Sequence, residues 1–461
     1  SVASRVTGRS PADMAASRKR PAGPPVGEDP PSGASAPPLS RARRSASPEG
    51  NQWTSGVPVF SDEAEALLRA LDGAEAEGWR WPGAEPAVRA LVAFLRERND
   101  ETSIFLQRSM AEILKCAGRW LSGEPGDGLA ELALEVLGLA ALESDARCQL
   151  VLDAGLAVVA MRLLEERQAV ASVVRSALFL AVNLMAMSDD RKNTLMTLGV
   201  ARLALRALGE FETNNDIQSI GILVLGTLGA GDESRRACLM RLGCGEAVVE
   251  VLRRCEDCTE VQWNALIAAN NLAAQSDERA ERLFQLGIGD RILVALQRHQ
   301  HDAGVQQYGF AVAASLSSRS QRRKTHLFER GMKDCIATAL RHHKDDVDVV
   351  CWALVVIVNL ANGSQERAQE LLAAGVDELV LQALELHPPM PAIQGQGILA
   401  LNNLSAGNET RKNYFMDKGA GNLMVAALRN HAEIHITLKQ VLAVIGVFSR
   451  DSLARAQSFA T

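Results

Sequence analysis

The chain has few aromatic residues and no long hydrophobic run. Phe, Trp and Tyr make up 4% of its 461 residues, and runs of β-branched residues are scarce, which favours helices over strands. The longest apolar run, VVCWALVVIVNLA at 349–361, is shorter than the roughly 18 residues that a transmembrane helix needs. The first ten residues, SVASRVTGRS, contain no apolar signal-peptide core. The sequence therefore predicts an all-α protein with no membrane span.

An excess of basic charge is also absent, and the cysteines form no metal-binding pattern. The formal net charge of −6 argues against a general nucleic-acid binder. Of the eight scattered cysteines, only Cys255 and Cys258 have the spacing of a zinc or redox motif. No second Cys or His pair stands at a useful distance from them, so we expect free core thiols, without a metal or cofactor.

The first 61 residues differ from the rest of the chain. Residues 1–60 hold 10 of the 16 prolines and eight basic against four acidic residues, so they carry +4 and the remainder −10. Proline removes helix donors and this segment has little to bury, so we predict a disordered Pro/Ser/Arg-rich tail over 1–61. Its clusters SRKRP (17–21) and SRARRS (40–45) have two interpretations, a solvated tail or a nuclear-import signal.

Helical periodicity begins after this tail. The segments DEAEALLRALDGAEAEG (62–78) and PAVRALVAFLRERN (86–99) place apolar residues three and four positions apart. Pro86 suits the first turn of a helix, because its missing N–H is not needed there. We predict a helical N-terminal cap over 62–99.

From about residue 100 the sequence repeats every 44 residues. A glycine column comprises Gly155, Gly199, Gly243, Gly287, Gly331, Gly375 and Gly419. An arginine column comprises Arg147, Arg191, Arg235, Arg279, Arg323, Arg367, Arg411 and Arg455. An apolar column comprises Val151, Leu195, Leu239, Leu283, Leu327, Leu371, Phe415 and Phe459. Self-similarity at one fixed period is the signature of a repeat architecture.

Each unit predicts three helices. In the unit 364–407, SQERAQELLAA is a short first helix, which Gly375 ends because glycine adopts positive φ without steric cost. VDELVLQALEL and AIQGQGILALNNLSA are the second and third helices, and a single unit cannot bury their apolar faces. Stacking of neighbouring units would bury these faces in one continuous core.

These units resemble the armadillo repeat. The resemblance rests on the strings NLMAMSDDRKNTLMTLG (183–199), NLAAQSDERAERLFQLG (271–287), NLANGSQERAQELLAAG (359–375) and NLSAGNETRKNYFMDKG (403–419). It covers residues 100–461 as about eight repeats plus a truncated ninth, and the first unit diverges because Ala111 and Ser103 replace the recurring Gly and Arg. The truncated last repeat and the missing initiator Met leave open that the chain is a fragment of a larger protein.

The resemblance implies a right-handed superhelical solenoid whose third helices line a concave groove. In relatives such as importin-alpha and beta-catenin, an asparagine late in the third helix holds the backbone of an extended partner peptide, since its amide both donates and accepts. The matching column is Asn183, Thr227, Asn271, Ser315, Asn359 and Asn403, followed by Val447. Importin-alpha also has a Trp four residues before each Asn. The corresponding residues here include no Trp, which argues against binding of nuclear-localisation signals: Phe179, Leu223, Ile267, Ala311, Val355 and Leu399.

Residues seven positions before this column lie on nearly the same helix face and extend the candidate groove. The predicted groove residues are Asn183, Asn264, Asn271, Tyr308, Ser315, Trp352, Asn359, Gln396 and Asn403. Tyr308 and Trp352 are the expected aromatic anchors. An acidic rim is expected at Asp216, Glu260 and Asp348. This surface favours a partner segment with basic and apolar residues. The alternative is that the asparagines brace neighbouring helices.

Two further columns have structural explanations. We expect each recurring Arg to bond carbonyls at the end of the preceding third helix, or an acid in a neighbouring unit, rather than a ligand. Histidines recur at His299, His343, His387 and His431. Equivalent positions in stacked units are about 10 Å apart, whereas metal–nitrogen bonds are about 2.0 Å, so one ion cannot bridge them. We expect structural or helix-end histidines.

No catalytic motif is present in the sequence. It contains no phosphate-binding loop, nucleophile elbow, kinase signature or zinc-protease helix, so we expect no enzyme, no cofactor and no small-molecule substrate. The pattern favours a protein-interaction scaffold or adaptor that presents a groove to extended or helical segments of protein partners, without direct nucleic-acid binding. The alternatives are a nuclear-transport adaptor, or the targeting segment of a larger signalling protein such as a kinase or ubiquitin ligase. The expected location is the cytoplasm, or the nucleus if the basic clusters act in import.

A reporter fusion distinguishes the two interpretations of the basic clusters. If they form an import signal, a fluorescent protein fused to residues 1–60 will accumulate in the nucleus. A purely cytosolic signal would rule out import and leave the solvated tail.

Overall fold

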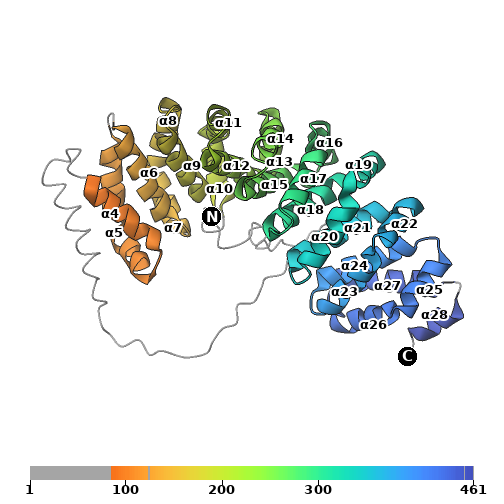
Figure 1. The fold of residues 1–461 in the computed structure, drawn as a ribbon. Coiled ribbons are helices and arrows are strands. Elements are labelled where there is room, and N and C mark those ends of the chain that lie inside the picture. The colour runs from red at the N-terminus through yellow and green to blue at the C-terminus, as the bar shows by residue number, and fades with distance from the viewer. Residues whose placement is uncertain (1–84, 123–124, 451, 460–461) are drawn as a thin grey trace, which may run out of the picture. The chain divides into compact units, whose positions relative to one another are not determined.

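The computed structural model describes residues 85–122, 125–450 and 452–459, and every regular element in these ranges is a helix (Figure 1). The chain divides into two compact units, with the boundary between Ala247 and Val248, inside α14 (Cys244–Arg254). The predicted tail over 1–61 and the predicted helix over 62–78 lie outside the described residues. Among the helices that are described, none is both long and apolar enough to cross a membrane.

The first unit begins with α4 (Glu85–Glu97), where the sequence predicts a helix over 86–99. It continues with α5 (Asp100–Leu121) and α6 (Asp127–Ala141). Two three-helix repeats follow. They are α7 (Asp145–Asp153), α8 (Leu156–Glu166), α9 (Ala171–Met185), then α10 (Asp189–Thr197), α11 (Val200–Glu210), α12 (Asn215–Gly229). The unit ends with α13 (Glu233–Arg241) and the first residues of α14.

The second unit continues α14 and then contains α15 (Thr259–Ala273). Three repeats follow it. They are α16 (Asp277–Gln285), α17 (Ile288–Arg298), α18 (Ala303–Ser317), then α19 (Gln321–Leu327), η1 (Phe328–Met332), α20 (Lys333–His342), α21 (Val347–Ala361), then α22 (Gln365–Ala373), α23 (Val376–Leu386), α24 (Pro391–Ser405). The last elements are α25 (Glu409–Asp417), α26 (Ala420–Asn430), α27 (His435–Ser449) and α28 (Leu453–Ser458).

The start of each first helix is encoded by a capping residue. A Ser, Asp or Asn side chain accepts a hydrogen bond from the backbone N–H of the recurring arginine three residues later, which satisfies one of the unpaired donors of the first turn. The capping residues are Ser144, Ser188, Asp232, Ser276, Ser320, Ser364, Asn408 and Ser452.

The recurring glycines separate the first helix from the second. All seven have positive φ, between 71° and 104°, where a side chain would be strained. In the repeat 320–363 the separation is less complete, because the π-helical turn η1 joins α19 to α20 and Gly331 is the one residue in it with non-helical angles. The predicted glycine break is confirmed.

The three-helix prediction is wrong for the first unit of the repeat. Ala111 stands where glycine recurs, and α5 runs through it as one helix of 22 residues, so a first and a second helix are fused. Alanine has no access to the left-handed conformation at low cost, so nothing interrupts the helix.

The third helices form the centre of each unit. In the first unit α6 contacts α9, and α9 contacts α12; in the second, α15, α18, α21, α24 and α27 each contact the next (Figure 1). The apolar column is fully buried from Val151 to Phe415. Each repeat therefore completes its core with side chains of its neighbours, as in other repeat proteins.

Two glycines at the ends of α11 test the conformational role of the glycine column. Gly199 has φ of 84°, whereas Gly209 lies inside the helix, and a Cβ at either position would meet no atom within 4 Å. Gly199→Ala should lower the free energy of unfolding by about 1–2 kcal/mol. The matched control Gly209→Ala should raise it by up to about 1 kcal/mol. Urea unfolding of the two variants measures both, and equal effects would contradict the proposed role.

Candidate peptide-binding surface

The recurring arginines tie each repeat to the one before it. Arg323 is 1% exposed, and its Nε donates to the carbonyl of Leu316 at the end of α18, at 2.6 Å. Its Nη1 donates to Glu281 of the preceding repeat at 2.7 Å, and its Nη2 pairs with Asp277. The hydrogen bond from Arg323 lowers the pKa of the Glu281 carboxyl. Both predicted partners, the helix-end carbonyl and the neighbouring acid, are therefore confirmed.

The same arrangement recurs with one variation. Arg191, Arg235 and Arg455 each bond a carbonyl seven residues earlier and an acid 46 residues earlier. Arg367 and Arg411 instead meet glutamine side chains 46 residues earlier. Arginine still bonds the preceding repeat where glutamine replaces the acid, because the guanidinium has five N–H donors and can bond a neutral oxygen.

The asparagine column braces the third helices. Asn359 Nδ2 donates to the carbonyl of Ala314 at 3.1 Å and to Ser317 Oγ at 3.2 Å. Asn403 Nδ2 donates to the carbonyl of Val358 at 2.9 Å, and Asn183 Nδ2 makes the equivalent bond to Gly138 at 2.9 Å. In each case the acceptor carbonyl lies 45 residues earlier, in the preceding third helix. These asparagines thus have the bracing role that was the alternative to peptide contact, and the bonds use only the amide nitrogen.

Exposure divides the predicted groove residues into two groups. Asn183, Asn264, Tyr308 and Gln396 are at most 6% exposed and offer almost no surface to a partner. The remaining five are half-buried and lie on α15, α18, α21 and α24 of the second unit: Asn271, Ser315, Trp352, Asn359 and Asn403. Contact with a partner stays a prediction, and these five residues carry it.

Sequence reasoning missed an aromatic side chain on the same helices. Trp263 of α15 is half-buried and lies eight residues before Asn271, about 80° around the helix from it. It packs over Gly304, where a Cβ would lie 3.1 Å from the indole nitrogen. Trp263 stands one residue before the column of Asn264, Tyr308 and Trp352, so the signal for it is an aromatic residue at the adjacent repeat position.

A glutamine column was also missed, although it recurs at the same period. Gln306 Nε2 donates to the carbonyls of Leu296 at 2.8 Å and His299 at 3.1 Å, at the end of α17. Equivalent pairs of bonds are made by Gln218, Gln262 and Gln394. These residues join the second helix to the third within a repeat.

The histidines are structural, as predicted. His299, His343, His387 and His431 each follow the last residue of a second helix, and each Nε2 bonds a backbone carbonyl 43 residues earlier at 2.7–2.9 Å. Within the described ranges no group of three or more His, Cys, Asp or Glu residues could hold a metal ion.

None of the eight cysteines, all within the described residues, forms a disulfide, as predicted, and six are buried. Burial raises the pKa of the Cys244 and Cys351 thiols to about 12, so both remain protonated at neutral pH.

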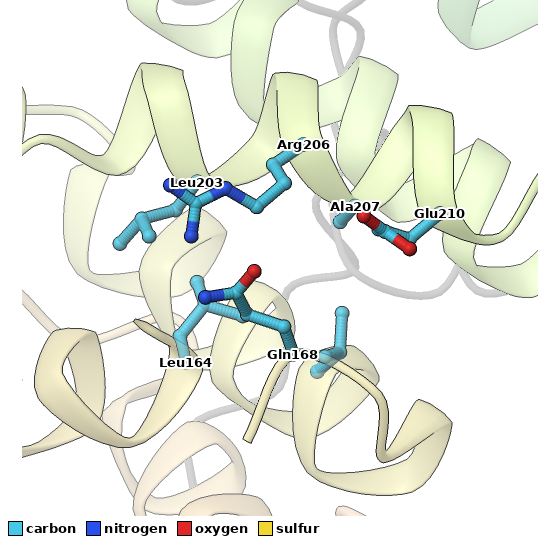
Figure 2. A pocket seen from close by; sticks show the side chains of 7 residues that line it. Leu164, Gln168, Leu203, Arg206, Ala207 and Glu210 are labelled. Atoms are coloured by element: carbon cyan, nitrogen blue, oxygen red, sulfur yellow. The ribbon is translucent and has the colours of Figure 1, made fainter. Parts of the chain in front are cut away.

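Two cavities in the first unit lie away from the asparagine column. The smaller, about 10 Å³, has Leu164 and Gln168 on one side and Arg206 and Glu210 of α11 on the other (Figure 2). It has room for about one water molecule. The larger, about 350 Å³, lies between α7, α8 and α10, and its lining includes Asp153, Val158, Asp190 and Leu198. None of the predicted groove residues lines either cavity.

Comparison with known proteins supports the fold. No family model and no curated protein matches this sequence. The crystal structure of an engineered protein superposes with a TM-score of 0.62, covering 85% of this chain and 97% of that chain at 18% identity. A computationally designed armadillo repeat protein for modular peptide recognition covers 54% of this chain and 98% of its own, with 22% identity and a TM-score of 0.45.

The repeat architecture defines the class of fold. A first helix of 9 residues, a glycine break, a second helix of 11 residues and a third of 15 recur along both units. The protein is an all-α solenoid of the armadillo type.

The arginine contact can be tested with two neighbouring residues that share Glu281. Arg323 is buried, whereas the side chain of Arg322 is 64% exposed and pairs with Glu281 at 2.6 Å. Arg323→Ala should lower the free energy of unfolding by about 2–4 kcal/mol, because it removes a buried side chain and leaves the Leu316 carbonyl and Asp277 without this donor, although Glu281 keeps Arg322. Arg322→Ala, the matched control, should cost at most about 1 kcal/mol. Urea unfolding at neutral pH checks this, and similar losses in both variants would show that burial of the guanidinium is unimportant.

Proposed function

We propose that the protein is a scaffold that binds extended segments of partner proteins along the third helices of its second unit. The observation that carries this proposal is a row of half-buried polar side chains at equivalent positions of four neighbouring helices. They are Asn271, Ser315, Asn359 and Asn403.

Two of these side chains are held in place before any partner arrives. The bonds of Asn359 and Asn403 to the preceding helix fix each amide, so binding would not have to order it. A peptide backbone offers an N–H and a C=O at nearly every residue, and an asparagine oxygen can accept from that N–H whatever the side chain is. Because the amide nitrogen already bonds inward, we expect these residues to act mainly as acceptors toward the partner. The Asn403 oxygen also accepts from Asn402 Nδ2 at 3.3 Å, and its second lone pair would serve the partner.

The surrounding side chains favour a particular kind of segment. Trp263 and Trp352 supply half-buried aromatic surface, and Glu260 and Asp348 are half-buried acids on the same helices. A partner segment with apolar and basic residues matches this chemistry. Peptide binding is also the function of the armadillo relatives that the sequence resembles. The proposed mechanism is presentation of a rigid surface, without a chemical step.

A matched pair of asparagine variants separates binding from bracing. Asn271, Asn359 and Asn403 are replaced together by Ala in the full chain. The control is Asn183→Ala, which removes the same type of brace from a residue only 2% exposed. Both proteins are used to select binders from a display library of unstructured peptides.

We expect the wild type and Asn183→Ala to enrich the same peptides, with apolar and basic residues. The triple variant should lose at least tenfold in affinity for them while keeping its helical circular dichroism. If the triple variant binds these peptides as the wild type does, the asparagines only brace the helices and the proposal fails.

A further inference from the structure

The first helix of one repeat contains a buried lysine without an acidic partner. Lys324 of α19 is only 3% exposed. Among the described residues none forms a hydrogen bond or an ion pair with its ammonium. Burial, and the positive charge of Arg367 beside it, lower the pKa of Lys324. A buried cation without a partner costs free energy, and most buried charges in folded proteins are therefore paired.

The equivalent lysines in other repeats share one acid with the recurring arginine of the next repeat. Asp189, the first residue of α10, pairs with Lys192 at 3.5 Å and with Arg235 at 2.7 Å. The acid lies three residues before the lysine and 46 residues before the arginine, so one carboxylate meets two cations. The same arrangement recurs in α25 and α28 with the residues Glu409, Lys412 and Arg455.

Glutamine stands in the place of this acid in the repeat that contains Lys324. Gln321 is the first residue of α19, three residues before Lys324 and 46 before Arg367, and the first turn of α19 contains no acid. Its Oε1 accepts from Arg367 Nη2 at 2.9 Å. Glu366 is next to Arg367 in α22 and is exposed, yet burial still lowers the pKa of Arg367. Lys324 and Arg367 are therefore two neighbouring cations that lack the carboxylate of the equivalent repeats.

The position of that carboxylate is accessible from solvent. The side chains of Asp189 and Glu409 are 26% and 55% exposed, although the lysines that they pair with are at most 9% exposed. Gln321 is exposed as well. A carboxylate from outside the chain can therefore approach the two cations from the side on which the chain's own acids lie in other repeats.

We infer that Lys324 and Arg367 bind a carboxylate of the partner segment, which supplies the negative charge that Gln321 lacks. This assignment rests on the proposed function, because the carboxylate belongs to the segment that lies along the third helices. Hydrogen bonds between charged groups are about twice as strong as those between neutral groups. An incoming carboxylate should thus displace the neutral Gln321 side chain from Arg367.

The site lies at the end of the helix that carries Asn359. Arg367 Nε donates to the carbonyl of Leu360, the residue after Asn359, at 2.7 Å, and α19 contacts α21. In the last complete repeat Lys412 donates at 3.4 Å to the carbonyl of Val447, which occupies the repeat position of Asn359. The acid should therefore lie close to the part of the segment that bonds Asn359, among the apolar and basic residues expected elsewhere.

A carboxylate built into the chain tests the missing charge without any partner. Gln321→Glu should raise the midpoint of urea unfolding, because the new acid pairs with both Lys324 and Arg367. The matched control is Gln365→Glu at the same position of the next repeat, where Ala368 replaces the lysine and only Arg411 gains an acid. An equal or smaller gain in Gln321→Glu than in Gln365→Glu would show that Lys324 does not lack an acid, and would overturn the inference.

Peptide selection tests the bound carboxylate itself. The full-length wild type, Lys324→Met and Gln321→Glu each select from the display library of unstructured peptides. We expect the wild type to enrich peptides with Asp or Glu at one fixed position. Exchange of that acid for its amide should weaken binding to the wild type about tenfold. It should hardly affect the two variants, because one lacks the ammonium and the other supplies its own carboxylate.

Lys192→Met is the matched control for Lys324→Met. Lys192 is similarly buried, but it pairs with Asp189 and belongs to the first unit, so its loss should leave the preference for the acid unchanged. Circular dichroism checks that all variants fold. Selected peptides without a fixed acid, or a preference for the acid that persists in Lys324→Met, would overturn the inference and leave the proposed function intact. If the wild type enriches no peptide, the proposed function fails and this inference fails with it.

Discussion

The arginine at the start of each first helix, buried in five of eight cases and half-buried in the others, makes the contact on which the repeat array depends. One guanidinium bonds carbonyls at the end of the preceding third helix and also reaches a side chain 46 residues earlier, as Arg235 does with Leu228, Ala230 and Asp189. A solenoid gains its stability from interfaces between neighbours, so an interaction repeated at successive interfaces of a unit acts on all of them. Lysine could not replace it, because an ammonium lacks the planar set of donors that meets several acceptors at once.

Most other recurring polar residues also connect helices by bonding backbone carbonyls. The histidines bond a loop of the preceding repeat, the glutamines join the second helix to the third, and the asparagines brace successive third helices. A buried carbonyl without a donor is costly, and these side chains supply donors at helix ends that stacking removes from water. Asn359 braces the preceding helix through its amide nitrogen, which bonds the Ala314 carbonyl and Ser317. The half-buried row of Asn271, Ser315, Asn359 and Asn403 is the surface proposed to contact a partner.

The period, the glycine breaks and the roles of Arg and His could be predicted from the sequence, because each depends on local geometry repeated every 44 residues. The fusion of two helices in α5 follows from Ala111, a departure visible in the sequence whose consequence appears only in the structure. Exposure was harder to predict. Tyr308 and Trp352 occupy the same repeat position, yet Tyr308 is buried and Trp352 half-buried, because neighbouring side chains decide how much of each ring remains accessible.

Selective ¹⁵N labelling of asparagine tests the binding surface most directly. A peptide selected by the full chain is titrated into the labelled protein while the side-chain amide signals are followed by NMR. The proposed function predicts shifts for Asn271, Asn359 and Asn403, and none for the buried Asn183 or for the exposed Asn413 on α25. Unchanged signals from the three asparagines, with binding still observed, would place the peptide elsewhere and contradict the central claim.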